Sequence, residues 1–275
     1  MTESHRGMVD RLSGYGGASA DETAFARAYL APGDMDPELF SRLGDADRIA
    51  AREEIKARRK AEDWAALGHY REANAALVGA PVDVVFIGDS ITEMWAVAQP
   101  DLFAGGVVGR GVSGQTSAQI LLRFMADVVA LRPRAVHLMC GVNDIAGNTG
   151  PTTPDDYHNT MRALVVLARA HGMGVILGSL TPITALPWAP EVQKPRERVQ
   201  QLNAGLRDLA DAEGLIYADY FPVLADAEGA LRSDLTRDGV HPQREGYALM
   251  HSVVAPLLNR AEEAPSLRVA TSGKG

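Results

Sequence analysis

From residue 82 onward, short apolar runs alternate with longer segments in which apolar residues recur at helical spacing. Short apolar runs that end at glycine or at a polar residue are typical of strands buried on both faces of a sheet. Such runs lie at residues 84–87, 107–108, 135–140, 175–180 and 215–218. The segments between them predict helices over 116–131, 153–171, 196–213 and from Pro242 onward. This order of elements predicts an α/β fold with one parallel sheet covered by helices on both faces.

The first 80 residues follow a different pattern. Residues 1–33 are rich in Gly, Ala and Ser, show little periodicity, and are expected to run along the surface. Helices are predicted at 36–43 and at 45–67, the second of which is dense in Ala, Glu, Lys and Arg. The thin apolar stripe of the second helix favours a solvated helix packed by one edge over an arm that forms a homo-oligomer. We therefore expect a partly helical extension (1–80), a main domain (81–260) and a polar tail (261–275).

Composition and charge narrow the class of protein. Of the 275 residues, 46% are hydrophobic and 23% are charged, which predicts a globular fold. The net charge of −8 disfavours a nucleic acid or an anionic membrane as partner. No apolar run is long enough to span a bilayer, and the only cysteine, Cys140, cannot form an intrachain disulfide. No apolar signal region follows Met1, so we expect a cytoplasmic protein, with a mature secreted form as the alternative.

Polar residues that can carry chemistry follow the predicted strands. Because the carboxyl ends of parallel strands meet at one edge of a sheet, the segments after them are expected to lie together. These segments are Gly88-Asp89-Ser90, residues 110–116, Gly141-Val142-Asn143-Asp144, and Asp238-Gly239-Val240-His241 after the fifth strand. Together they supply a hydroxyl, backbone N–H groups, a side-chain amide and an Asp–His pair, which are the groups that acyl transfer needs.

Each group has an expected role in that reaction. Ser90 would be the nucleophile and His241 the base, with Asp238 three residues earlier fixing the imidazole tautomer. The N–H groups of Ser90 and Gly114 and the amide of Asn143 would form the oxyanion hole. Candidate substrate-binding residues are Asp89 and Trp188. Trp188 belongs to the Pro-rich loop 181–195, which we expect to wall the acyl side and favour short acyl groups.

The four segments resemble the motif blocks of the SGNH/GDSL hydrolases, and the chain is similar to bacterial GDSL-type esterases. The residues that match the family's motifs are Ser90, Gly114, Asn143 and His241, with Asp238 as the acid. The resemblance covers about residues 82–258, and Ile91 stands where the family usually has leucine. It implies a flavodoxin-like three-layer α/β/α sandwich, here with five parallel strands, and ester hydrolysis by a serine nucleophile. We expect no cofactor and no metal.

The substrate class is less specified than the reaction. Carboxylic esters with short acyl chains, such as acetyl esters or acetylated carbohydrates, are the first expectation. Alternatives within the family are a carbohydrate O-deacetylase, a lysophospholipase or a thioesterase. An alternative of another class is a metal-dependent phosphoesterase, whose ligands would come from Asp89, Asn143, Asp144, Asp238 and His241.

Two other interpretations of the residues after the first strand are a flavin site and a purely structural helix cap. A flavin-binding protein is disfavoured because Asp89 would repel a phosphate at the first strand end. Alternatively, Ser90 could simply be the N-cap of a helix, since any one of these motifs alone is more often structural. The metal interpretation also lacks support, because no His-x-x-x-His or Asp-x-His spacing accompanies its candidate ligands.

Overall fold

The computed structural model describes residues 20–33, 50, 54–55, 57–58 and 61–263. These residues form a five-stranded parallel sheet with the order β2-β1-β3-β4-β5. Its strands are β1 (Val84–Gly88), β2 (Val107–Gly111), β3 (Ala135–Met139), β4 (Gly174–Gly178) and β5 (Ile216–Ala218). The α/β class and the five-stranded parallel sheet expected from the sequence are confirmed.

Among the described helices, α1 and α4 precede β1, and each strand is then followed by one or two helices. They are α1 (Ala20–Tyr29), α4 (Arg71–Ala76), α5 (Ser90–Ala98), α6 (Ser117–Asp127), α7 (Val142–Ile145), α8 (Pro154–Ala170), α9 (Pro195–Glu213), α10 (Phe221–Leu224) and α11 (Arg244–Glu263). Short 3-10 turns lie at Val129–Leu131 and Ser233–Leu235.

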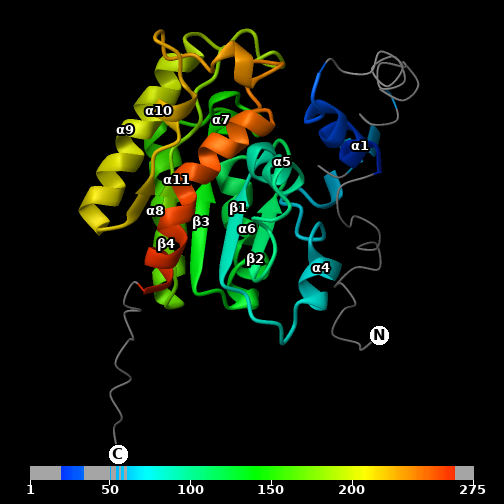
Figure 1. Ribbon diagram of the computed structural model, residues 1–275, viewed down its shortest axis with the longest axis vertical. Helices are drawn as coiled ribbons and strands as arrows, with labels where there is room; N and C mark the ends of the chain where they lie inside the picture. Colours follow the sequence, from blue (N-terminus) through cyan, green and yellow to red (C-terminus); the bar gives the residue numbers. More distant parts are fainter. Residues whose placement is uncertain (1–19, 34–49, 51–53, 56, 59–60, 264–275) are drawn as a thin grey trace, which may run out of the picture.

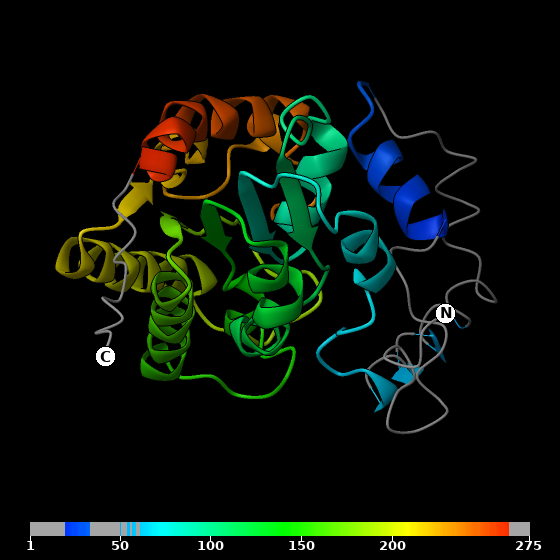
Figure 2. The ribbon, with the colours of Figure 1, turned by 90° about the horizontal axis from the view of Figure 1, so that it is seen from below.

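Helices cover the sheet on both faces, as Figure 2 shows. α5 and α11 pack on one face, whereas α6, α8 and α9 pack on the other. β1 lies between β2 and β3, and all five of its residues are buried. The segments that follow the strands, including α7 and the start of α5, gather at the upper end of the sheet in Figure 1. The fold therefore brings the predicted strand-end residues to one edge.

Local sequence signals place several helix ends. Thr153 caps α8 through a capping box with Asp156, and the chain leaves α9 at Gly214 in the left-handed region. One prediction was too long, because the helix expected over 116–131 ends at Asp127 and a 3-10 turn follows. The turn ends at Arg132, whose left-handed backbone cannot continue a helix.

The extension is more ordered at its start than its composition suggested. Residues 20–29 form α1, which packs beside α5 (Figures 1 and 2), so the expectation of an irregular surface segment is wrong there. Tyr29 and Leu30 are buried at the end of this helix. The composition did not show this, because the apolar contact is concentrated in the last turn.

The helix predicted over 45–67 does not reach its expected end. Residues 61–62 are helical, but the Asp63 carboxylate then accepts hydrogen bonds from the backbone N–H groups of Leu67 and Gly68, and Ala66 has a positive φ. The chain therefore turns at Asp63 instead of continuing the helix. The predicted helix at 36–43 and about half of the one at 45–67 lie outside the described residues, so the homo-oligomer considered as the alternative for these helices is not tested.

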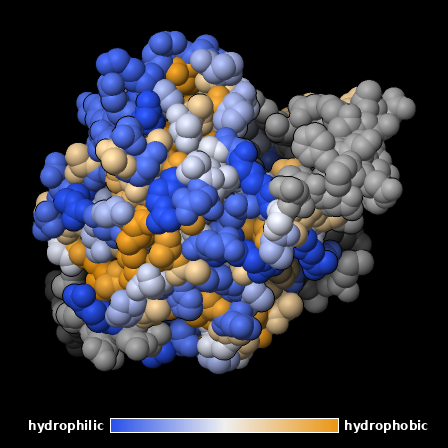
Figure 3. Space-filling view, turned by 45° about the horizontal axis from the view of Figure 1, so that its top comes forward, coloured by the Kyte–Doolittle hydropathy of each residue, from blue (hydrophilic) through white to orange (hydrophobic). Residues whose placement is uncertain are grey.

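The outer surface is mixed in character. Figure 3 shows hydrophilic residues over much of the displayed face, with smaller hydrophobic areas between them. No helix in the described part of the chain is both long and apolar enough to cross a membrane.

Candidate active site

Ser90 stands where β1 turns into α5. A Cβ at Gly88 would collide with the Met139 carbonyl oxygen and the Thr92 hydroxyl, so only glycine fits the end of this buried strand. The N-cap of α5 is Asp89, whose carboxylate accepts a hydrogen bond from the Ile91 N–H at 3.0 Å. The interpretation of Ser90 as an N-cap is thus wrong: Ser90 is the first helical residue and is partly exposed.

The structure brings Ser90, His241 and Asp238 into one line of hydrogen bonds. Ser90 Oγ lies 2.9 Å from His241 Nε2, although the two residues are 151 positions apart in the chain. His241 Nδ1 lies 2.7 Å from Asp238 Oδ2 on the far side of the ring. The imidazole is 18% exposed and the Asp238 side chain is 33% exposed. Solvent and a small substrate can therefore reach this line.

Asp238 is kept in its charged form. Burial raises the pKa of a carboxyl, but the hydrogen bond and the positive charge of His241 outweigh it and lower the pKa of Asp238 well below the ordinary value. The backbone N–H groups of Val240 and His241 add to this effect, because both donate to Asp238 Oδ1 at 2.9 Å. A permanently ionised Asp238 favours the His241 tautomer with its proton on Nδ1, which leaves Nε2 free to accept from Ser90.

Gly114 and Asn143 lie at the ends of the two strands that flank β1. Gly114 is exposed and has φ +79°, and a Cβ there would approach only the Asn148 amide, at 3.8 Å. The backbone conformation therefore explains the glycine better than lack of space does. The amide of the buried Asn143 donates to the Gln115 carbonyl at 3.0 Å, and the other acceptor found for it in the described part of the chain, Asp89 Oδ2, is 3.5 Å away. That second contact is weak, so one N–H of Asn143 can turn to a substrate oxyanion.

Asn148 connects the predicted oxyanion residues to Trp188. Its amide nitrogen donates to the Gly114 carbonyl and to Asn143 Oδ1, both at 2.9 Å. Its oxygen accepts from the Trp188 indole N–H at 3.1 Å. The exposed Trp188 thus lies at the rim of this group, whereas Asp89 is buried at the N-terminus of α5. Asp89 does not reach the surface as a substrate contact would.

The remaining acids near the site are engaged by protein donors. Burial raises the pKa of Asp89 and of Asp144 to about 6, against hydrogen bonds that lower it. The Asp144 carboxylate accepts from the backbone N–H and the hydroxyl of Ser117, at 2.9 and 2.6 Å. Among the described residues, no group of three or more His, Cys, Asp or Glu is placed to hold a metal ion. The ligand set proposed for a phosphoesterase therefore does not converge.

Two contributors to the site were missed by the sequence reasoning. Asn148 carries no motif of its own, although it lies five residues after Asn143 in a loop rich in glycine. Tyr29 lies over two hundred residues from Asp238, and its hydroxyl is 3.1 Å from Asp238 Oδ1. The only available signal for Tyr29 was a pair of large apolar residues, Tyr29-Leu30, at the end of an Ala-rich segment.

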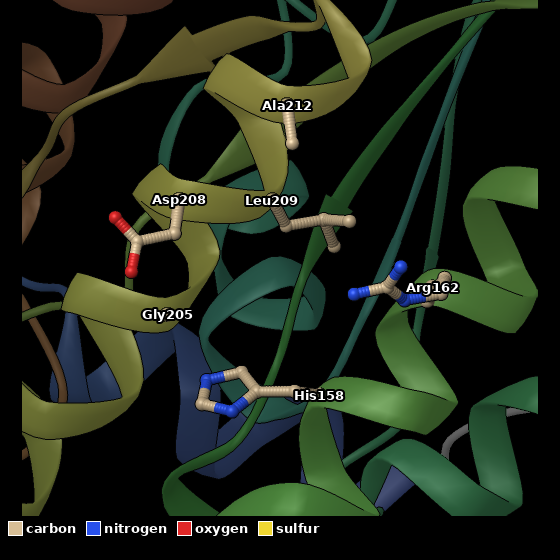
Figure 4. Close-up of a pocket in the computed structure, with 6 residues that line it drawn as sticks. All are labelled: His158, Arg162, Gly205, Asp208, Leu209 and Ala212. Atoms are coloured by element: carbon tan, nitrogen blue, oxygen red, sulfur yellow. The ribbon is translucent and has the colours of Figure 1, made fainter.

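A separate hollow lies between α8 and α9 (Figure 4). It is lined by His158, Arg162, Gly205, Asp208, Leu209 and Ala212. The close approach of His158 to α9 explains Gly205, because a Cβ there would collide with the imidazole. These residues come from two helices on one face of the sheet, not from the strand ends that carry Ser90.

The sequence matches the GDSL-like Lipase/Acylhydrolase family over residues 86–249. This match spans more than half of the chain and includes the end of β1, Ser90, Gly114, Asn143 and His241. The chain belongs to that family. The family resemblance inferred from the motif blocks is therefore confirmed, and the protein is a carboxylic ester hydrolase.

Known proteins support the same assignment. A GDSL-like lipase from Bacteroides thetaiotaomicron is 38% identical, with a TM-score of 0.69, and covers 72% of this chain and 100% of its own. A protein from Bacteroides fragilis proposed to be an acylhydrolase is 37% identical, with a TM-score of 0.70, over 73% of this chain and 99% of its own. An acetylxylan esterase from Geobacillus stearothermophilus is 26% identical over 152 residues, which is 52% of this chain and 68% of that protein.

Proposed function

We propose that the protein hydrolyses carboxylic esters with Ser90 as nucleophile, His241 as general base and Asp238 as the supporting acid. The observation that carries this proposal is the line of two hydrogen bonds, 2.9 Å from Ser90 Oγ to His241 Nε2 and 2.7 Å from His241 Nδ1 to Asp238 Oδ2. Both distances are within the range needed for proton transfer, and the order of groups is that of a serine hydrolase triad.

In the first half of this mechanism, His241 Nε2 takes the proton of Ser90 Oγ as that oxygen attacks the ester carbonyl carbon. The negative charge passes to the carbonyl oxygen, where the Ser90 and Gly114 N–H groups and the Asn143 amide donate hydrogen bonds. The C–O bond to the alcohol then breaks, and the alcohol leaves with the proton from His241. Asp238 stabilises the imidazolium while it carries that proton.

In the second half, water hydrolyses the acyl-serine. His241 removes a proton from the water, whose oxygen attacks the acyl carbon, and the oxyanion again lies against Gly114 and Asn143. The bond from the acyl carbon to Ser90 Oγ breaks, and His241 returns the proton to Ser90. The products are the free acid and a regenerated enzyme.

For the substrate, we propose esters with short acyl chains, in particular acetyl groups on a carbohydrate or a simple alcohol. Trp188 is tied to Asn148, and Asn148 to Gly114, so the exposed indole lies close to the place proposed for the acyl group. A flat indole at the rim suits a sugar ring or a small acyl group. The similarity to an acetylxylan esterase supports the same choice.

The test combines a nucleophile variant with a series of acyl chain lengths. Ser90→Ala should abolish turnover of aryl acetates and prevent labelling by a serine-directed phosphonate, while the melting temperature stays close to wild type. Ser252→Ala, which removes an exposed hydroxyl on α11, is the matched control and should keep full activity. An active Ser90→Ala enzyme would contradict the mechanism, and faster turnover of long-chain than of acetyl esters would contradict the substrate class.

A further inference from the structure

Tyr29 lies in α1, outside the region that matches the family, yet its hydroxyl contacts the segment that carries Asp238 and His241. The hydroxyl oxygen is 3.1 Å from Asp238 Oδ1 and 2.8 Å from the His241 carbonyl oxygen, and it accepts a hydrogen bond from the Arg237 N–H at 3.0 Å. The phenol ring also meets the imidazole edge to face, with 6.1 Å between centroids. The single hydroxyl proton is therefore shared between the two residues of the proposed acid–base pair.

Two arginines fix the end of α1 against the same segment. Arg237 donates to the carbonyl oxygens of Tyr29 and Ala31, at 3.1 and 2.9 Å. Arg244 donates to the Leu30 carbonyl at 2.8 Å and to the Ala98 carbonyl of α5 at 2.7 Å. Cationic side chains on the last carbonyl groups of a helix are a favourable arrangement. These hydrogen bonds hold the backbone at Tyr29 in place, so the position of its hydroxyl does not depend on the Tyr29 side chain alone.

We propose that Tyr29 is a positioning residue for ester hydrolysis, which fixes Asp238 and the backbone of His241 so that the imidazole stays directed at Ser90. This proposal rests on the function proposed above. The extension then supplies part of the acid–base machinery without touching the substrate. Thr184 supports the opposite side of the same loop, because its N–H donates to the Gly239 carbonyl at 2.7 Å. The loop is thus held from two directions, and of these two residues it is Tyr29 that contacts the Asp238 carboxylate.

The protonation state of Tyr29 suits this role. Burial, together with the nearby charge of Asp238, raises the pKa of Tyr29 to about 12. The hydroxyl therefore remains a donor throughout the pH range in which an esterase is assayed. A donor on Asp238 Oδ1 stabilises the carboxylate and weakens its attraction for an imidazolium ion. Removing the donor should make His241 easier to protonate.

Several titratable or charged groups near His241 could affect the pH dependence of the reaction. Those that face it or its partners are Asp238 on the same loop, Tyr29 on α1, Ser90 on α5, Asp89 before α5, Tyr247 on α11, and Arg237 next to Tyr29. A Tyr29→Phe substitution changes only one of them. The shift of the pH profile can therefore be assigned to the lost hydroxyl.

The experiment compares Tyr29→Phe with Tyr220→Phe in the full chain on an aryl acetate. Tyr220 is the matched control, because it is also buried and its hydroxyl lies 2.8 Å from the imidazole of His137, outside the proposed site. For Tyr29→Phe we expect kcat to fall about three- to ten-fold with KM changed less than about two-fold, as expected for one hydrogen bond. The acid limb of kcat/KM should move to higher pH by about half a unit.

All rates are divided by the number of sites that a serine-directed phosphonate labels at completion, so that a partly unfolded variant does not imitate a lower kcat. Tyr220→Phe should leave both kcat per site and the acid limb where they are. A Tyr29→Phe enzyme whose acid limb does not move, or whose kcat per site is that of wild type, overturns the proposal. Failure of the proposed function is seen separately, as turnover by Ser90→Ala.

Discussion

The two sides of Ser90 are held by different means. On the acid–base side, Asp238 and His241 lie three residues apart, and a single turn of backbone organises both. Asp238 Oδ1 accepts from the N–H groups of Val240 and His241, while Oδ2 faces the imidazole. Apart from Tyr29 on α1, the contacts to this carboxylate come from within one short loop.

On the oxyanion side, the contacts come from separate parts of the chain. Asn143 donates to the carbonyl of Gln115, whose side chain accepts from the buried Arg123 at 2.5 Å. Arg123 also donates to the Gly88 carbonyl at 2.9 Å, just before Asp89 and Ser90. Asn148 completes the arrangement by donating to Asn143 Oδ1. This side is therefore a buried polar network that extends beneath the nucleophile.

The two sides therefore differ in what would act directly on the reacting groups: a carboxylate beside the imidazole on one side, and neutral amide and backbone N–H groups on the other, with the charged Arg123 one residue further away behind Gln115. A single carboxylate stabilises the transient imidazolium, so its removal should take away this entire contribution to kcat. In an amide network several donors and acceptors contribute. Single substitutions should therefore lower kcat by different amounts, depending on how directly the removed group contacts the oxyanion.

The largest effect is expected on the acid–base side. Asp238→Asn keeps the size of the side chain but removes its charge and favours the wrong imidazole tautomer, so kcat should fall by about 10³–10⁴-fold. The measurement is kcat on a short aryl ester, with a thermal melt to verify folding. Unchanged rates would remove Asp238 from the mechanism, and a loss below about ten-fold would mean that the backbone alone orients His241.

The next effect belongs to the oxyanion side. Asn143→Ala should lower kcat by about 10²–10³-fold, or about 3–4 kcal/mol, with little change in KM, because the donor acts mainly in the transition state. Asn143→Asp should be at least as damaging, since it places a negative acceptor beside the oxyanion.

Asn143→Asp also distinguishes the serine mechanism from the metal-dependent alternative. A carboxylate is a better ligand than an amide for a hard cation, so a metal enzyme would keep or gain activity with Asp at this position. Both variants are assayed with and without a chelator. An active Asn143→Asp enzyme that the chelator silences would refute the serine mechanism.

Between the two sides lies Asp89, for which we expect a pH-dependent effect on stability. Burial raises its pKa to about 6, so between pH about 4 and about 6 the folded protein holds a proton that the unfolded chain has lost. This contribution to stability is present at low pH and is lost as the pH rises through that window. Asp89→Asn can still cap α5 but cannot titrate.

The unfolding free energies of wild type and Asp89→Asn should therefore differ in a pH-dependent manner. From pH 4 to pH 7 the difference should move in favour of the variant by on the order of 2–3 kcal/mol. Other titrating groups, Asp238 among them, are common to both proteins and cancel in the difference. Urea denaturation at each pH supplies the values, and a constant difference would mean that Asp89 is ionised in both states.

The smallest effect is expected for Asn148. Asn148→Ala removes two donors to the oxyanion side, to Asn143 Oδ1 and to the Gly114 carbonyl, but neither hole donor itself. We expect kcat to fall about five- to ten-fold, which corresponds to about 1 kcal/mol. Asn159→Ala, on an exposed position of α8, is the matched control. A loss as large as that of Asn143→Ala would show that the network acts as one unit.

Much of the fold, and the meeting of the motif segments at one edge of the sheet, could be predicted from the sequence. The sheet, its helices and the meeting of the four motif segments at one edge followed from apolar runs, capping residues and the order of elements. The Asp–His spacing predicted its own geometry, because three residues fit one turn. The catalytic roles of these residues stay predictions until the variants are measured.

Two features could not be predicted from the sequence: a contact between residues far apart in the chain, and a buried charged side chain. Tyr29 reaches Asp238 across 209 positions of sequence, which no local pattern encodes. Arg123 lies on α6 and looks like a solvent-facing charge, yet it is 0% exposed and binds Gly88, Gln115 and Asp127. A charged residue inside a helix is usually exposed, so only the tertiary structure shows that this one is enclosed.

The large sequence separation between Ser90 and His241 affects the order of events during folding. β1 pairs with β2 and β3 across 23 and 51 positions of sequence (Val84 with Val107 and with Ala135). The contact between Ser90 and His241 closes a much longer loop of 151 residues, and the one between Tyr29 and His241 a loop of 212. Contacts between such distant segments form late when folding is limited by loop closure. In the proposed mechanism, esterase activity after dilution from denaturant therefore returns only when residues 236–242 have docked. Its time course reports that last step, and it should lag behind the recovery of helix and sheet signals.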